Sequence, residues 1–102
     1  MTMLLKVKLA LRITTDAFDS ELTDLIQAAL ADLGIAGVWD VTNDSPFTDT
    51  TTDALVTRAV ITYCKAHFGE PDEYDRLKAS YDEQKAQLKT ATGYTVWTEA
   101  QN

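Results

Sequence analysis

Few residues in this chain could carry out covalent chemistry, and the best pair is Cys64 with His67. They lie three residues apart, so on a helix both side chains could face the same way, as a thiol nucleophile and its base would. A catalytic pair also needs a third group that orients the base, and the sequence has none at a suitable spacing. Because free cysteine is among the most buried residue types, we interpret both residues as core-facing positions of a buried helix. The sequence therefore predicts a protein without catalytic residues.

Acidic residues gather at two places where a metal site has to be considered. The first group is Glu70, Asp72, Glu73 and Asp75, and the second is Asp16, Asp19 and Glu21. Neither group has the alternating oxygen ligands, the glycine and the terminal glutamate of a calcium loop. Carboxylates are favoured at the first turn of a helix, so we interpret both groups as helix starts. We predict that the chain needs no metal and no cofactor.

The aromatic residues outside the helical pattern are the best candidates for function. Tryptophan and tyrosine are favoured at the centres of protein interfaces. These side chains could either fold back and close the core or anchor a partner, and the sequence leaves both readings open. Together with neighbouring apolar residues they form the predicted protein interface, which comprises Trp39, Val41, Phe47, Tyr94, Val96 and Trp97.

The elements that position these residues are four predicted helices, derived from the spacing of apolar side chains. We expect them at residues 3–13, from 16–20 to 33, at 53–68 and at 71–90. The first of them also fits the alternation of a strand, but its leucines, lysines and alanine favour a helix. Gly34 is expected to end the second helix and Pro71 to begin the fourth. The helix at 53–68 has the broadest apolar face, which predicts the central position.

The predicted fold class is all-α, a small four-helix bundle-like domain with a long loop between helices 2 and 3 and an extended C-terminal tail. The loop at 35–50 is dense in turn residues and has room for a short extended piece. The whole of residues 1–102 is expected to form one domain, with its core in 3–90 and its tail in 91–102. The predicted main core is Leu25, Ile26, Leu30, Leu55, Val56, Val60, Tyr63 and Leu77, and the side chains expected toward solvent include Lys6, Lys8 and Arg12.

The charge of the chain excludes several classes of partner. Asp and Glu number 16 against 9 Lys and Arg in 102 residues, which gives a net charge of -7. Such a chain would not release counterions from a phosphate backbone, and it would be repelled by an anionic membrane surface. Its apolar runs are too short to span a membrane, and we interpret its first residues as structure rather than a signal peptide. The composition therefore favours a small, acidic, intracellular domain without catalytic activity.

The order and the amino-acid sequences of the predicted helices resemble those of a known family, the head-tail connector proteins of long-tailed phages and prophages. These are also called head-completion or adaptor proteins. The resemblance extends from about residue 4 to residue 88. The segments that carry it are LRIT at 11–14, DSELTDLIQAALADLGI at 19–35, LVTRAVITYCKAHFG at 55–69 and EPDEYDRLKASYD at 70–82.

The resemblance implies a structural role. Such a protein is a small helical subunit that forms a ring, usually of twelve copies, beneath the portal protein of the filled head. The ring extends the DNA channel and seats the stopper or tail-completion protein, and DNA passes through it without specific binding. The contact segments implied here are 35–50 and 91–102, where the unplaced aromatic residues also lie. The implied location is the head-tail junction of a virion that is assembled in the bacterial host cytoplasm.

Two other functions remain open from the sequence. The chain could be a small acidic helical phage regulator that binds a basic partner, in which case a monomer or dimer is expected rather than a ring. It could also be a small hydrolase that uses Cys64 and His67, in which case Cys64 must be accessible to a thiol reagent in the folded protein.

Overall fold

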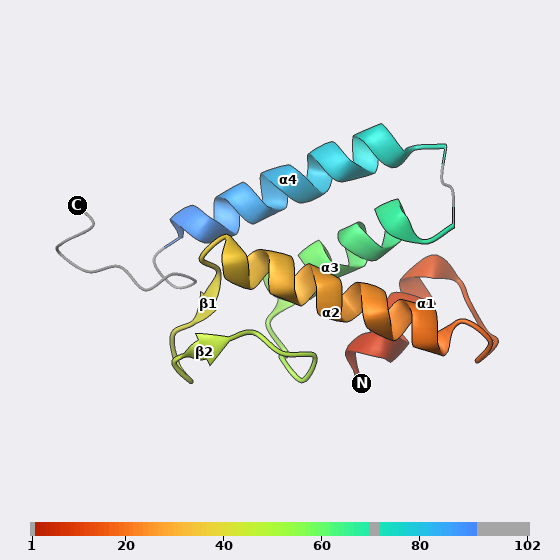
Figure 1. Ribbon diagram of the computed structural model, residues 1–102, viewed down its shortest axis with the longest axis horizontal. Helices are drawn as coiled ribbons and strands as arrows, with labels where there is room; N and C mark the ends of the chain where they lie inside the picture. The colour runs from red at the N-terminus through yellow and green to blue at the C-terminus, as the bar shows by residue number, and fades with distance from the viewer. Residues whose placement is uncertain (1, 70–71, 92–102) are drawn as a thin grey trace, which may run out of the picture.

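The computed structural model describes residues 2–69 and 72–91, and it shows the predicted all-α fold (Figure 1). The helices are α1 (Met3–Leu11), α2 (Asp19–Ile35), α3 (Ala54–His67) and α4 (Tyr74–Thr90). Between α2 and α3, the short strands β1 (Trp39–Asp40) and β2 (Ser45–Pro46) pair antiparallel, with Trp39 opposite Pro46 and Asp40 opposite Ser45. The prediction of four helices is confirmed, and the loop between the second and third contains a small hairpin.

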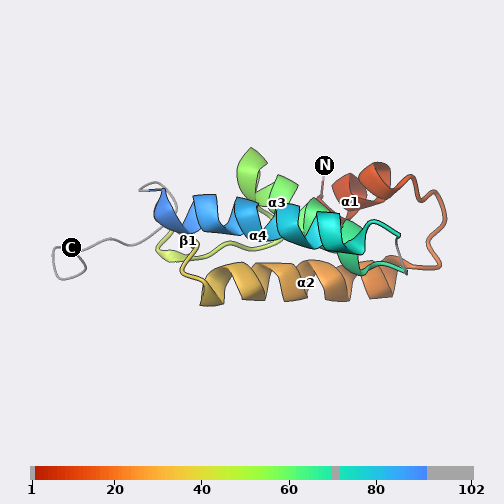
Figure 2. The same cartoon turned by 90° about the horizontal axis from the view of Figure 1, so that it is seen from above.

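Helix α3 is the centre of the packing, as its broad apolar face predicts. It packs against α1, α2 and α4, and α2 also packs against α1 and β2. Figure 2 shows α2 along one side of the molecule and α1 on the other. The helix begins where the Asp53 carboxylate accepts the backbone N–H groups of Leu55 and Val56 at 3.0 and 3.1 Å, which satisfies two donors that have no partner within the helix.

Half of the eight residues predicted for the main core are buried. The buried ones are Ile26, Leu30, Val56 and Val60. Leu25, Tyr63 and Leu77 are only partly buried, and Leu55 is 53% exposed, so its placement in the core is wrong. Helical spacing cannot decide which of two adjacent apolar residues faces inward, and α3 turns Val56 inward and leaves Leu55 at the surface. The largest fully buried side chains are Val7, Leu22, Leu33, Val38, Val56, Val60 and Cys64.

Helix α2 does not end at Gly34 as predicted. It continues to Ile35, and Gly37 takes the left-handed conformation with φ of +96°. The N–H of Val38 then donates to the carbonyl of Leu33 at 2.9 Å, and the N–H of Gly37 donates to that of Gly34 at 3.1 Å. This pair of bonds is a Schellman motif, which satisfies carbonyls at the helix end and turns the chain toward β1.

Helix α1 ends with the same bond pattern, but without a glycine. Arg12 takes the left-handed conformation with φ of +59°, and the N–H of Ile13 donates to the carbonyl of Lys8 at 2.9 Å. The regular helix therefore stops at Leu11, two residues before the predicted end. A non-glycine residue is strained in this conformation because its Cβ approaches the following carbonyl.

Helix α4 begins at Tyr74, three residues later than predicted. Residues 70–71 lie outside the described part of the chain, so Pro71 is not tested as the first helical residue. Glu73 precedes the helix, and its side chain makes no capping bond to the backbone. Its carboxylate accepts a hydrogen bond from Arg76 at 2.6 Å instead. Asp72 and Glu73 lie directly before the first turn and Asp75 lies within it, as expected of a helix start, and Glu70 lies outside the described residues.

Candidate assembly surfaces

Cys64 is buried among the side chains of the core and is unsuited to act as a nucleophile. Burial raises the pKa of its thiol from 9.0 to about 12, so the reactive thiolate is suppressed at neutral pH. His67 was expected to face the core as well, but it is exposed. Its ring lies 4.3 Å from that of Tyr63 and 5.6 Å from that of Tyr74, measured between centroids. The imidazole therefore packs between two tyrosines at the surface of α3 and α4.

The acidic group at 16–21 holds a buried lysine rather than capping α2. The Nζ of Lys8 lies 2.9 Å from Oδ1 of Asp16 and 2.8 Å from Oδ1 of Asp19. Lys8 was expected at the surface, yet it is buried because these two carboxylates take up its charge. Hydrogen bonds to Asp19 and then to Asp16 raise the pKa of Lys8, and the bond from Lys8 lowers that of Asp16. Three charges are thereby committed to fixing the turn between α1 and α2.

A second polar cluster joins α4 to α2. The hydroxyl of Tyr81, a buried residue of α4, donates to Oδ2 of Asp32 at 2.6 Å, and Nζ of Lys85 lies 3.0 Å from the same oxygen. Burial raises the pKa of the Asp32 carboxyl, but the bonds from Tyr81 and Lys85 outweigh it and hold the pKa below its usual value. The sequence gives no signal for this cluster, because Tyr81 and Lys85 lie 49 and 53 residues from Asp32 along the chain.

The hairpin holds Trp39, one of the predicted interface residues, in place. The indole N–H of Trp39 donates to Oδ1 of Asp44 at 3.2 Å, and Asp44 itself has a positive φ of +53°. The Asp40 carboxylate accepts from the backbone and side chain of Asn43, and these bonds lower the pKa of Asp40, the side-chain bond most strongly. Hydrogen bonds of the Asp40 and Asp44 carboxylates thus fix the conformation of the hairpin turn.

Apolar side chains near the hairpin differ in their exposure. Phe47 packs against the core and Trp39 is partly buried, whereas Val41 is exposed. Ile35, the last residue of α2, is 87% exposed. We name Ile35, Trp39, Asp40, Val41 and Asp44 the hairpin end. The other predicted interface residues, Tyr94, Val96 and Trp97, lie outside the described residues.

Helix α1 presents a second apolar surface, which the sequence analysis did not single out. Leu5 and Leu9 are large exposed hydrophobic residues, Leu9 to 64%. They are four residues apart, so they share one face of the helix, and Arg12 follows three residues further along. Next to Leu5 lies a hollow of about 510 Å³ between α1, α2 and the chain near Asp49. We name Leu5, Leu9 and Arg12 the α1 stripe.

A third surface feature is a groove of about 370 Å³ between the start of α3 and the second half of α4. Leu55 and Leu88 line it, and Ala91, the last described residue, lies at its edge. Oε1 of Gln84, which also lines the groove, is buried without a hydrogen-bond partner among the described residues. The groove thus has both apolar and polar lining and lies beside the C-terminal end of α4.

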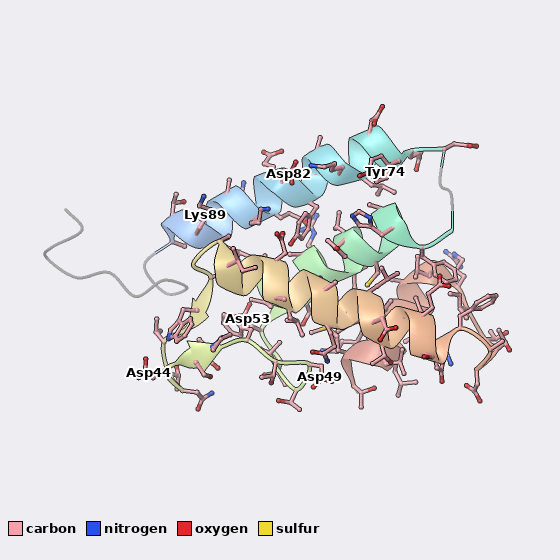
Figure 3. All side chains as sticks on the ribbon, in the orientation of Figure 1. Asp44, Asp49, Asp53, Tyr74, Asp82 and Lys89 are labelled. Atoms are coloured by element: carbon pink, nitrogen blue, oxygen red, sulfur yellow. The ribbon has the colours of Figure 1, made fainter. Side chains whose placement is uncertain are left out.

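Within residues 2–69 and 72–91, no group of three or more histidine, cysteine or acidic side chains is arranged to bind a metal ion. In the same part of the chain, no helix is long and apolar enough to cross a membrane. The surfaces that remain are suited to contact with other proteins. Figure 3 shows Asp44 at the tip of the hairpin, and Asp82 and Lys89 along α4.

Comparison with known proteins decides the family. The sequence model of one protein family, described as phage connector protein, matches residues 3–95. The chain belongs to this family. Among curated proteins and among solved structures, no match to the chain was found.

The match confirms the family resemblance that the sequences of the helices indicated. It covers all four helices, the hairpin and the first residues beyond α4. The connector is accordingly a component of the phage head-tail junction that contacts other virion proteins there. The family is a structural one, which fits the buried thiol of Cys64.

Proposed function

We propose that the connector forms a closed ring of twelve copies, which matches the symmetry expected of a portal, beneath the portal protein of the filled head. The ring extends the DNA channel and seats the stopper or tail-completion protein. The observation that carries this proposal is the family match over residues 3–95. Assembly takes place in the bacterial host cytoplasm, and the protein needs no membrane and catalyses no reaction.

The charge of the connector supports a passive channel for DNA. With a net charge of -7, its surface repels phosphates rather than holding them. Of the basic residues, Lys8, Arg76, Lys78 and Lys85 already pair with carboxylates of the same chain. DNA therefore passes through the ring without specific binding.

The contacts of the ring and its partners are assigned to the segments 35–50 and 91–102. In the first segment, the hairpin presents Val41 and Trp39 on a turn fixed by hydrogen bonds. In the second, Tyr94, Val96 and Trp97 follow directly after α4. Exposed apolar side chains such as that of Val41 mark contact sites in proteins.

The experiment uses DNA-filled heads that lack the connector. Purified connector is added, and completion is measured as protection of the packaged DNA from nuclease and as the joining of tails. The proposal predicts that the connector restores both. Heads that retain DNA and accept tails equally well without it would contradict the proposal.

A pair of tail variants tests the second contact segment. Replacing Tyr94 and Trp97 with alanine should leave the helical circular dichroism unchanged and abolish head completion. The matched control replaces Thr95 and Thr98 of the same tail with alanine and should complete heads normally. Loss of helical signal in the aromatic variant would show instead that Tyr94 and Trp97 belong to the core.

A further inference from the structure

Two of these surfaces, the hairpin end and the α1 stripe, lie toward opposite ends of the long axis of the described chain. In Figure 1 the hairpin is at one end and α1 lies toward the other, and the perpendicular view in Figure 2 shows the same separation. A ring of identical subunits needs two different patches on each subunit that contact each other between neighbours. Patches at opposite ends of an elongated subunit meet this requirement, whereas two patches on one face do not.

We propose that the α1 stripe of one copy docks against the hairpin end of the next copy and that this junction closes the ring. The proposal rests on the ring of the proposed function and adds the surfaces that form it. It assigns α1 a role in assembly that neither its sequence pattern nor the family match indicates.

The charges of the two patches are complementary. Residues 1–15 contain three basic residues and no acidic one, whereas residues 36–46 contain Asp40 and Asp44 and no basic one. Lys8 is neutralised within the chain by Asp16 and Asp19, which leaves Lys6 and Arg12 as the free charges of this end. No ion pair of Arg12 occurs within the described residues, and its side chain is exposed.

The apolar groups and the shape agree with the charges. Leu5 and Leu9 offer an apolar strip beside a hollow of about 510 Å³, and Ile35 projects from the end of α2 with 87% of its surface exposed. An isoleucine left in water on a soluble monomer gains nothing for folding, whereas its burial against leucines in an interface is favourable. The hairpin bonds that fix Asp40 and Asp44 hold this end in a defined shape before assembly.

Cross-linking on heads tests the junction in the assembled protein. The full-length connector carries Leu9→Cys and Ile35→Cys, and a short bismaleimide is applied after the connector has bound to filled heads. The native Cys64 is buried and should not react. We expect a ladder of covalent multimers from this variant and only monomers from either single variant. The matched control, Leu9→Cys with Leu55→Cys, places the second thiol on a leucine that is 53% exposed and lies outside both patches, and it should give no ladder.

Mixing two variants in solution tests whether the junction is head-to-tail. Leu9→Gln damages the α1 stripe and Ile35→Gln damages the hairpin end, and neither residue is buried, so both variants should fold. Neither alone should associate, but a mixture should form one-to-one dimers in sedimentation velocity, because the intact stripe of one variant meets the intact hairpin end of the other. Leu55→Gln should assemble as the unsubstituted connector does.

The outcomes separate the junction from the proposed function. A connector that completes heads but gives no ladder, or whose two glutamine variants each still form rings, overturns the junction and leaves the proposed function standing. A connector that neither binds to heads nor completes them overturns the proposed function itself.

Discussion

The bond between Tyr81 and Asp32 allows a quantitative test of how α4 is held against α2. Tyr81→Phe removes one hydroxyl and keeps the aromatic packing with Tyr63, whose ring centroid lies 5.1 Å away. A hydrogen bond to a charged group contributes about 1.5–3 kcal/mol. The Asp32 side chain is 40% exposed and keeps its bond to Lys85, so solvent and the lysine compensate part of the loss. We therefore expect a loss of about 1–2 kcal/mol in the free energy of unfolding.

The measurement is urea unfolding followed by circular dichroism, at a protein concentration low enough to keep the chain monomeric, because assembly would add stability. Tyr74→Phe is the matched control, since Tyr74 lies at the exposed start of α4, and it should change the stability by less than about 0.5 kcal/mol. A double-mutant cycle with Asp32→Ala should show a coupling energy of about 1 kcal/mol. Additive effects, or an unchanged stability of Tyr81→Phe, would refute the bond as a link between the helices.

The same bond predicts a dependence on pH with a definite sign. The pKa of Asp32 is lowered in the folded chain, so the stabilisation is fully present above its unfolded pKa and is lost as the pH falls through the folded pKa. The difference in stability between the unsubstituted chain and Tyr81→Phe should therefore be constant from about pH 5 to pH 8 and shrink below about pH 4. A difference that grows toward low pH would contradict the assignment.

Three further predictions concern single residues. Leu22→Ala, at a fully buried site, should cost about 2–5 kcal/mol in urea unfolding, whereas Leu55→Ala should cost under about 1 kcal/mol; similar losses would contradict the core described here. Cys64 should resist thiol reagents until the chain unfolds, and rapid labelling of the folded chain would contradict its burial. Its pKa is raised from 9.0 to about 12 in the folded chain, so the free energy of unfolding should fall as the pH rises through that interval. Arg12→Gly should stabilise the monomer by roughly 0.5–1 kcal/mol, because glycine removes the strain of the positive φ at some cost in backbone entropy, and it should weaken ring formation; a destabilised monomer would show that the side chain of Arg12 has a role in the fold.

The sequence predicts those parts of the fold that depend on local spacing. The apolar period identified all four helices, and the carboxylate of Asp53 begins α3 within one residue of the expected start. The ends of α1 and α2 were misplaced because Schellman motifs closed by Arg12 and Gly37 determine them, and Arg12 gives no signal as a left-handed residue.

Contacts between residues that are far apart along the chain could not be predicted from the sequence. The helical spacing of α1 places Lys8 with the other basic residues on the polar face. Only the ion pairs of Lys8 with Asp16 and Asp19, seen in the structure, explain why it is buried. The α1 stripe was missed for the opposite reason, since exposed leucines cannot be told from core leucines by spacing alone. Of the predicted interface residues, the structure describes Trp39, Val41 and Phe47, and their role in assembly stays a prediction.

The most direct test of the account is electron cryo-microscopy of DNA-filled heads to which the connector has been added. We predict one closed ring of connector subunits on the head-tail axis, between the portal and the next component, with α1 of each subunit against the hairpin of its neighbour. A vertex without such a ring on heads that nevertheless retain their DNA and accept tails would contradict the account.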